Sequence, residues 1–465
     1  MPAQALRWIL PVSGALLALA PHALAGDRPA LDVMPAYGRD YRFLKDPAAR
    51  TDALDPLKYI PLDTGATYLS LSGEARLRYD DFSDNPGFGI SGLKSDDYLF
   101  TRAIVGADLH LGANLRAFAQ LGSTTVNGKA GAVASTDASG TDWQQAFVEA
   151  TLPDGDDDRT AIRLGRQEVI FGSQRLVALR DGPNVRQAFD GVRVIFKTKG
   201  YELNAFAFHP VRVGRRDFDD ASDRSQSFYG VYATGPTGLS GVFADLYLMQ
   251  LDRTGAVFSQ GTAMERRTSA GGRLFGRRGA ADFNFEALYQ SGRFGAGAIH
   301  AWTFASDSGY TLRSLPWTPR LGLKADIASG DKDAHDSTLG TFNALFPKGG
   351  YFTENGLIGP ANIIDLQPGL TLMPTPAFTI VLSAVVLWRQ TTADAVYRQP
   401  NLPIAGTAGT PKRYTGTQYY VTPTWQITPH LLISATYVHF TVGHAIRSAH
   451  GADSDYFSSW LTYRF

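Results

Sequence analysis

The sequence predicts an all-β fold, a transmembrane antiparallel β-barrel of about eighteen strands, with sixteen strands as the alternative count. Three observations support this expectation: an N-terminal export signal without a later apolar helix, an alternation of apolar and polar residues, and a regular exchange of short and long connections. The chain accordingly divides into a signal peptide at 1–25, an N-terminal segment at 26–66 and a barrel at 67–465.

The first 25 residues have the three parts of a secretory signal peptide. Arg7 supplies the positive charge, residues 8–20 are apolar, and Ala23-Leu24-Ala25 forms a cleavage pattern before Gly26. No later stretch contains 18 apolar residues, so the sequence predicts no transmembrane helix. We therefore expect export to the periplasm, the outer membrane or the medium.

Composition excludes several classes of function. The 465 residues include no Cys, which excludes disulfides, thiol catalysis and zinc–thiolate sites. Basic and acidic residues balance at 44 each, which argues against a nucleic-acid partner. Of the 44 basic residues, 34 are arginines, whose planar guanidinium suits carboxylates and phosphates. This bias indicates an anionic ligand, although genomic base composition is an alternative cause.

Residues 69–80 illustrate the alternation. One face contains Leu69, Leu71, Gly73, Ala75, Leu77 and Tyr79, and the other contains Ser70, Ser72, Glu74, Arg76, Arg78 and Asp80. Successive side chains of a strand point to opposite faces, so one face is apolar and the other charged. The apolar face would meet a second sheet in a soluble sandwich, or lipid in a barrel with a wet lumen.

The number of such segments favours the barrel. Most are about nine to eleven residues long, the length that crosses a bilayer when tilted. The predicted strands are 68–80, 98–111, 114–122, 144–152, 160–167, 190–197, 201–209, 227–234, 242–251, 266–276, 281–290, 296–304, 319–328, 363–373, 377–389, 417–427, 431–440 and 456–465.

The connections between these segments alternate in length. Short ones lie at 112–113, 198–200, 277–280, 374–376 and 428–430. Long ones lie at 81–97, 123–143, 168–189, 210–226, 252–265, 329–362, 390–416 and 441–455. Short periplasmic turns and long extracellular loops are typical of bacterial outer-membrane barrels, which predicts that location and contacts with lipid and lipopolysaccharide.

The two ends of the mature chain differ. The last segment alternates aromatic residues and ends at Phe465, which resembles the signal that barrels present to their assembly machinery. Residues 26–66 are rich in Pro and Asp, and residues before Pro avoid helical conformations. This segment is expected either on the periplasmic side or inside the barrel mouth.

Alternation also predicts which charges face inward. The basic set is Arg76, Arg78, Arg102, Arg116, Arg163, Arg193, Arg267, Arg273, Arg320, Lys324 and Arg464. The acidic set is Glu74, Asp108, Glu149, Glu202, Asp282, Glu286 and Asp326. The arginines could form an electropositive constriction that attracts anions, or they could pair with acids across strands in a salt-bridge lattice.

The segment 163–193 concentrates arginines among glycines, which allow sharp chain reversals. Its loop arginines are Arg175, Arg180 and Arg186. The loop could fold back into the pore and act as a selectivity loop. Alternatively, it could remain extracellular, with its arginines on lipopolysaccharide phosphates or on Asp181 and Asp190.

Three runs carry a resemblance to a known family. Residues 164–194 read LGRQEVIFGSQRLVALRDGPNVRQAFDGVRV, residues 42–62 read RFLKDPAARTDALDPLKYIPL, and residues 325–331 read ADIASGD. Together they resemble the alginate export protein family over most of 40–465. The resemblance implies an eighteen-stranded outer-membrane barrel with an arginine-lined pore for an anionic polysaccharide such as alginate, working with a periplasmic polysaccharide-secretion complex.

The resemblance also suggests a set of pore residues. Arg166 falls on the arginine of the family's GRQ run, and alternation adds the others. The candidates for an anion-selective constriction are Arg76, Arg102, Arg116, Arg166, Arg193 and Arg464. The extended loop GSQRLVALRDGPNVR is similar to a broad branch of the family and differs from its alginate-secreting members.

Other functions find weaker support in the sequence. A porin of general type or one selective for small organic acids fits the size and the arginines. An outer-membrane hydrolase would need a catalytic motif, and neither G-x-S-x-G nor H-E-x-x-H occurs, so His439 and His444 are isolated candidates. Asp331, Asp333 and Asp336 could bind calcium but do not match the calcium-loop spacing. We expect passive transport without a cofactor.

Overall fold

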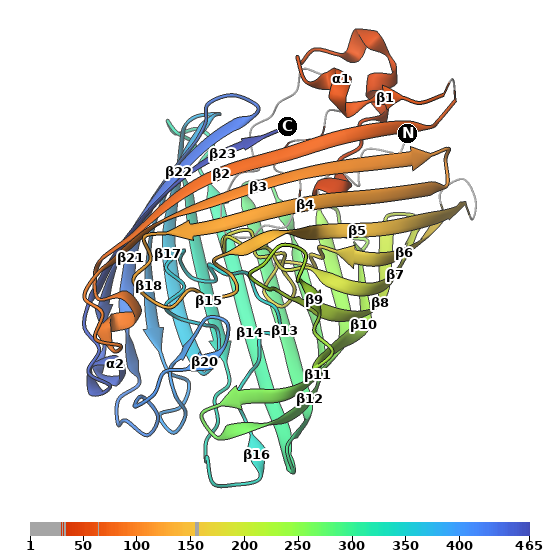
Figure 1. The fold of residues 1–465 in the computed structure, drawn as a ribbon. Coiled ribbons are helices and arrows are strands. Elements are labelled where there is room, and N and C mark those ends of the chain that lie inside the picture. Colours follow the sequence, from red (N-terminus) through yellow and green to blue (C-terminus); the bar gives the residue numbers. More distant parts are fainter. Residues whose placement is uncertain (1–28, 30, 32–33, 64, 154–157) are drawn as a thin grey trace.

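The computed structural model describes residues 29, 31, 34–63, 65–153 and 158–465, so the predicted signal peptide at 1–25 lies outside the described residues. Within the described part, eighteen long antiparallel strands form a closed barrel (Figure 1). The barrel closes because β2 pairs with β3 on one side and with the last strand, β23, on the other.

The barrel strands follow one another around the wall in chain order. They are β2 (Tyr68–Asp84), β3 (Asp96–Leu111), β4 (Leu115–Asn127), β5 (Ser139–Pro153), β6 (Arg159–Gln167), β7 (Phe189–Thr198), β8 (Tyr201–Arg212), β10 (Gln226–Pro236), β11 (Val242–Phe258), β12 (Gly261–Arg278), β13 (Ala281–Phe294), β14 (Gly297–Thr311), β15 (Arg320–Ala328), β17 (Ile363–Thr375), β18 (Phe378–Trp388), β21 (Tyr414–Gln426), β22 (Leu431–Val442) and β23 (Ser454–Arg464).

The remaining elements are short. They are β1 (Ile60–Pro61), β9 (Ala221–Ser222), β16 (Thr338–Leu339), β19 (Tyr397–Arg398), β20 (Leu402–Pro403), η2 (Ala36–Gly38), η3 (Arg42–Lys45), η4 (Pro47–Ala49), η5 (Pro86–Gly89), α1 (Asp55–Lys58) and α2 (His444–Ser448). No helix in the described ranges is both long and apolar enough to cross a membrane.

The predicted fold class and the count of eighteen strands are confirmed, and each predicted segment overlaps one barrel strand. The long loop predicted at 252–265 is wrong. There β11 and β12 continue pairing as far as Phe258 and Gly261 and are joined by a tight turn. The two strands extend beyond the roughly ten residues that a bilayer requires, so lipid no longer imposes an alternating pattern on them.

The two faces of the wall are as different as the alternation predicts. On the outer face, apolar side chains such as Val105, Leu164 and Leu246 are 59–68% exposed. On the inner face of β2, Arg76 and Arg78 are buried. An exposed apolar belt around a charged interior is the pattern that lipid on one side and a polar lumen on the other require.

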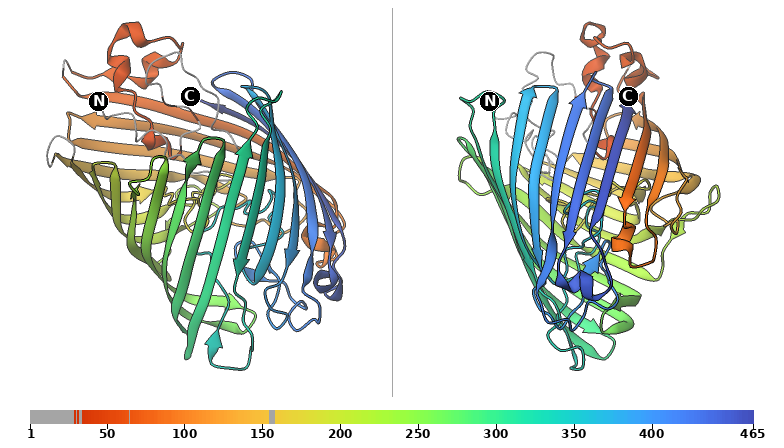
Figure 2. Two further views of the ribbon diagram at one scale, coloured as in Figure 1. Left: turned by 180° about the vertical axis from the view of Figure 1, so that it is seen from behind. Right: turned by 90° about the vertical axis from the view of Figure 1, so that its left-hand side faces the viewer.

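The described N-terminal segment packs at the end of the barrel where the C-terminus and the short turns lie (Figures 1 and 2). Tyr41, Leu44, Tyr59 and Tyr68 form a buried cluster that fixes this segment against β2. The C-terminal Phe465, directly after β23, exchanges two backbone hydrogen bonds of 3.0 Å with Gly73 of β2. The turn lengths identify this end as the periplasmic end.

Candidate functional site

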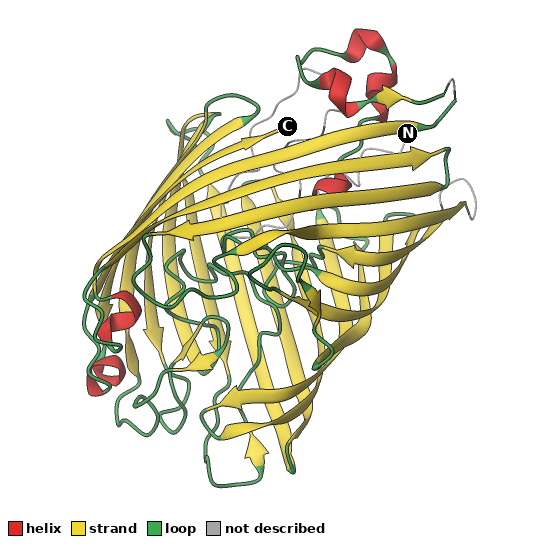
Figure 3. Cartoon of the chain, viewed as in Figure 1, coloured by secondary structure: helices red, strands yellow, loops and turns green. Residues whose placement is uncertain are grey.

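Three extracellular loops fold back into the lumen (Figure 3). They connect β6 to β7 (168–188), β15 to β17 (329–362) and β18 to β21 (389–413). Their buried apolar side chains join those of the inner wall in one hydrophobic cluster. The loops therefore fill much of the barrel interior and restrict the path through it.

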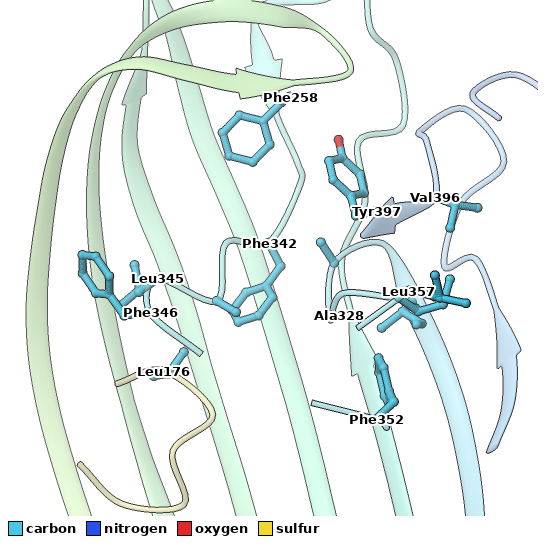
Figure 4. Packing of buried hydrophobic residues seen from close by; sticks show 14 of the residues in the cluster. Leu176, Phe258, Ala328, Phe342, Leu345, Phe346, Phe352, Leu357, Val396 and Tyr397 are labelled. Atoms are coloured by element: carbon cyan, nitrogen blue, oxygen red, sulfur yellow. The ribbon is translucent and has the colours of Figure 1, made fainter. Parts of the chain in front are cut away.

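The first two loops hold each other directly. The Ala178 amide donates to the Phe346 carbonyl (3.0 Å), and the Phe346 amide donates to the Leu176 carbonyl (2.8 Å). The Phe346 ring also meets Phe189 of the wall edge-on, with a centroid separation of 5.0 Å. Figure 4 shows Leu176 of the first loop beside Leu345 and Phe346 of the second. This packing makes the constriction a rigid part of the fold.

An ionic cluster ties the first loop to the wall, and we call it the Asp181 cluster. Asp181 accepts hydrogen bonds from Arg76 (2.8 Å), Arg102 (2.7 Å) and Arg186 (2.7 Å). Glu74 of β2 accepts from Arg102 (2.8 Å), Arg186 (2.6 Å) and Arg464 (2.8 Å). Its members are Glu74, Arg76, Arg102, Asp181, Arg186 and Arg464.

Four guanidiniums thus surround two carboxylates. Burial by itself raises the pKa of Asp181, yet Arg76, Arg186 and Arg102 together hold that pKa well below its usual range. Glu168 lies 4.0 Å from Arg186, and burial raises its pKa to about 7. The arginines of the cluster therefore serve mainly to hold an ionised Asp181 in place.

Most other inward arginines also have carboxylate partners. Arg163 contacts Glu149 (2.5 Å) and Arg273 contacts Asp245 (2.6 Å), each directly across two neighbouring strands. Arg320 contacts Asp282 (2.5 Å). These pairs form the salt-bridge lattice that the sequence left as an alternative to a free constriction.

Among the described residues, Arg180 and Lys348 of the first two inward loops have no carboxylate within ion-pair distance, and neither has Arg389 of the third, which donates to the backbone carbonyls of Asp394, Thr407 and Lys412 instead. Arg180 donates only to the Pro347 carbonyl (3.0 Å) and the Gln187 side chain (3.3 Å). Burial lowers its pKa to about 10. Burial also lowers the pKa of Lys348 to about 7, with repulsion from Lys324 and Arg175 acting in the same direction. Arg180 has a left-handed backbone (φ 59°), which costs a non-glycine residue about 1 kcal/mol.

Arg180 borders a cavity of about 220 Å³ between the three inward loops and the wall. Within it, Arg78 is neutralised by Asp80 at 2.6 Å. Burial raises the pKa of Glu354, and the cations that interact most strongly with this acid are Arg78 and Lys348. The aromatic side chains of the lining are Phe82, Tyr98, Phe100 and Tyr456. A partly free guanidinium beside aromatic rings can hold a small organic anion.

Two predicted pore arginines lie toward the periplasmic end. Arg116 pairs with Asp108 (2.5 Å), and Arg193 donates to the Asn204 side chain (2.8 Å). Both also contact Tyr37 of the N-terminal segment. The structure therefore separates them from the Asp181 cluster, which contains Arg76, Arg102 and Arg464.

The placement of Arg166 in the pore is wrong. Its side chain shares the face of Ile162 and Leu164, which are 42% and 59% exposed on the outside of β6. Arg166 pairs there with Asp190 (2.8 Å), directly opposite on β7. The resemblance of the GRQ run matches Arg166 to a position in the family's sequence, but it does not say which way the side chain points. The alternation along β6 puts Arg166 on the outer face.

The three loop arginines lie inside the barrel and not on the extracellular surface. Arg175 contacts Glu286 of the wall (3.2 Å), Arg180 borders the cavity, and Arg186 belongs to the Asp181 cluster. Sequence reasoning did not identify Tyr37, Lys348 or Glu354. Nothing in the local pattern marks them, because their position depends on how distant loops fold inward.

The proposed calcium ligands do not converge. Asp331 accepts from the Gly340 amide (3.0 Å), while Asp333 and Asp336 accept from amides of their own turn. Among the described residues, only Asp142, Asp219 and Asp220 come close enough together to share an ion. Arg166 lies 3.6 Å from Asp142 and supplies positive charge there instead.

Comparison with known proteins agrees with this architecture. The family model described as alginate export matches residues 67–459. The chain belongs to the alginate export family. It is an outer-membrane β-barrel channel of bacteria. No curated protein matches the chain.

Several solved structures share the fold of this family member at low sequence identity. OccK2 (OpdF) of Pseudomonas aeruginosa in complex with glucuronate is 11% identical, with a TM-score of 0.55, over 85% of this chain and 98% of that one. OpdK of the same species with vanillate is 14% identical, with a TM-score of 0.56, over 85% and 98%. OccAB1 of Acinetobacter baumannii is 12% identical, with a TM-score of 0.58, over 85% and 96%.

Proposed function

We propose that this channel lets small carboxylate-bearing solutes, such as sugar acids, diffuse passively across the outer membrane. The main support is the position of Arg180 and Lys348, which have no carboxylate partner in the described lumen, with Arg180 at a cavity of about 220 Å³. Charge that is not neutralised in a restricted pore attracts ions of the opposite sign. No energy source or cofactor is needed for such passage.

The size of the solute follows from the inward loops. Their aromatic and aliphatic side chains pack with the wall, so a wide polymer path would require them to move. Two channels of the same fold were solved with glucuronate and with vanillate, which are both small carboxylates. These observations favour a small organic anion over a long chain.

Export of an anionic polysaccharide such as alginate is the second candidate function, and family membership favours it. In that case the loops at 168–188 and 329–362 would swing away from each other. A periplasmic polysaccharide-secretion complex would then be the partner.

We further propose that the protein is not an enzyme. His439 does contact Asp455 (2.9 Å) and Thr441 (3.2 Å). However, this group shares a strand face with Tyr437 and Phe457, which are 45% and 38% exposed on the outside of the barrel. A hydrolytic site would need a cleft around the nucleophile and donors for the oxyanion.

The channel function can be tested in planar bilayers under a KCl gradient. We expect a reversal potential that reports anion preference, and stronger block by glucuronate than by glucose. Arg180→Gln should weaken both effects, whereas the exposed Arg278→Gln, at the periplasmic end of β12, should leave them unchanged. Cation preference, or equal block by glucose, would contradict the proposal. Block by oligouronates but not by glucuronate would support the second candidate.

A further inference from the structure

Tyr37 reaches from the N-terminal segment into the lumen and fills a cage on the inner wall. Its ring meets Phe118 and Phe147 edge-on, with centroid separations of 6.0 and 5.3 Å. The Arg163 guanidinium lies 4.0 Å from the centroid of the same ring. These three wall residues are 3–4% exposed. We call Phe118, Phe147, Arg163, Arg116 and Arg193 the Tyr37 cage.

Tyr37 forms hydrogen bonds at both of its polar ends, the side-chain hydroxyl and the backbone carbonyl. At one end, its hydroxyl donates to the Glu168 backbone carbonyl (2.7 Å) and accepts from Arg193 (3.5 Å). At the other end, Arg116 donates to the Tyr37 carbonyl oxygen (2.7 Å). In tyrosine that carbonyl carbon is three bonds from the ring. The cage therefore fits a phenol joined by a two-carbon chain to an acyl group.

The cage also contains an unused donor. The Nη1 atom of Arg163 is buried and has no hydrogen-bond partner in the described structure. Buried polar atoms of this kind are rare and indicate room for a further ligand atom or water. The guanidiniums are otherwise shared with carboxylates, since Arg116 contacts Asp108 and Arg163 contacts Glu149. Recognition would thus depend chiefly on the ring and its hydroxyl.

We propose that the Tyr37 cage is a binding site for phenolic carboxylic acids that reach the lumen, and that Tyr37 is its built-in competitor. The inference rests on the proposed channel function only in that the solute must enter the pore. The N-terminal segment does not need Tyr37 as its anchor. Leu44 is fully buried beside Tyr41, and His430 contacts Asp52 (2.8 Å), so the ring can leave while the segment stays attached.

Isothermal titration calorimetry on the purified full-length barrel tests this site, with 3-(4-hydroxyphenyl)propionate as the ligand. We expect Tyr37→Ala to bind it about tenfold or more tightly than the wild type, because the competitor is gone. Tyr37→Phe is the matched control, since its ring still fills the cage, and it should resemble the wild type. In Tyr37→Ala, 3-phenylpropionate should bind about three- to tenfold more weakly, because it lacks the hydroxyl.

Equal binding by Tyr37→Ala and the wild type, or no binding by either, would overturn the proposal. So would a gain that survives in the double variant Tyr37→Ala/Phe118→Ala, since the ligand would then bind elsewhere. Reversal potentials from the same preparations separate the two proposals. Normal anion preference without ligand binding would contradict the site alone, and ligand binding without anion preference would contradict the proposed function alone.

Discussion

The Asp181 cluster and the cavity beside Arg180 both involve the inward loop 168–188, yet their arginines differ in their partners. Those of the cluster are paired with carboxylates, and Arg180 is not. Arg76, Arg102 and Arg186 all donate to Asp181, one residue after Arg180. Arg180 itself contacts only a carbonyl and an amide oxygen. The comparison shows that the number of inward arginines overstates the positive charge that a solute can meet. Most of them position the loop, and few are left to attract anions.

Removing the acid at the centre of the cluster should have the largest effect. Asp181→Asn leaves four guanidiniums around Glu74 alone, so the loop should detach from the wall. Loss of a fully buried ionic partner costs about 3–5 kcal/mol, and with 33% of the Asp181 side chain exposed we expect about 2 kcal/mol. Limited trypsin digestion should then cleave within 168–188, and conductance should rise.

Asp219→Asn, at an exposed site in the loop after β8, is the matched control and should change neither measurement. An Asp181→Asn loop that stays resistant to trypsin would mean that the hydrophobic contacts with Phe346 suffice. In that case the arginines of the Asp181 cluster would not be needed to hold the loop, and their contrast with Arg180 would not be explained by that role.

The selectivity of the channel should depend on pH through Lys348. Its pKa is lowered to about 7 by burial and by repulsion from Lys324 and Arg175, so it is charged below neutral pH and neutral above. Anion preference should therefore fall as pH rises from about 6 to 8. Glu168, whose pKa is raised to about 7, becomes negative over the same range and adds to the fall.

Reversal potentials measured across this pH range test the assignment. Lys348→Met should remove most of the pH dependence, while Glu168→Gln should remove a smaller part because Arg186 lies beside that acid. A pH profile that Lys348→Met leaves unchanged would show that the solute path avoids this lysine.

Arg166→Ala should have the smallest effect. On the outer face it contacts Asp190 and not the lumen, so selectivity should not change. Loss of the pair and its hydrogen bonds should lower stability by about 1 kcal/mol. Thermal unfolding followed by circular dichroism checks the second expectation. A shift in reversal potential as large as that of Arg180→Gln would place Arg166 on the solute path after all.

The strands could be predicted because lipid and lumen impose opposite demands on neighbouring residues. Residues 69–80 alternate strictly for that reason. Beyond the bilayer this constraint ends, which is why the hairpin of β11 and β12 at 252–265 was mistaken for a loop. Alternation also identifies the outer face of β6, which contains Ile162, Leu164 and Arg166. Arg166 was placed in the pore on the resemblance of the GRQ run alone, without this check.

The candidate site could be predicted only in part. The inward direction of Arg76, Arg102 and Arg464 follows from strand alternation. Their common partner Asp181 does not, since it lies 105 residues from Arg76 in a loop whose path depends on tertiary packing. Lys348 gives no signal in the sequence, because what distinguishes it is the absence of a carboxylate beside it in the folded loops.

The most direct test compares two arginines of the lumen in one measurement, the reversal potential under a KCl gradient. Arg180 has no carboxylate partner among the described residues, whereas Arg273 contacts Asp245 at 2.6 Å. We expect Arg180→Gln to lower anion preference clearly, while Arg273→Gln leaves Asp245 with only the Tyr232 hydroxyl as its partner and has its effect mainly on stability. Equal loss of anion preference in the two variants, or a loss confined to Arg273→Gln, would contradict the claim that the unpaired cations set the selectivity.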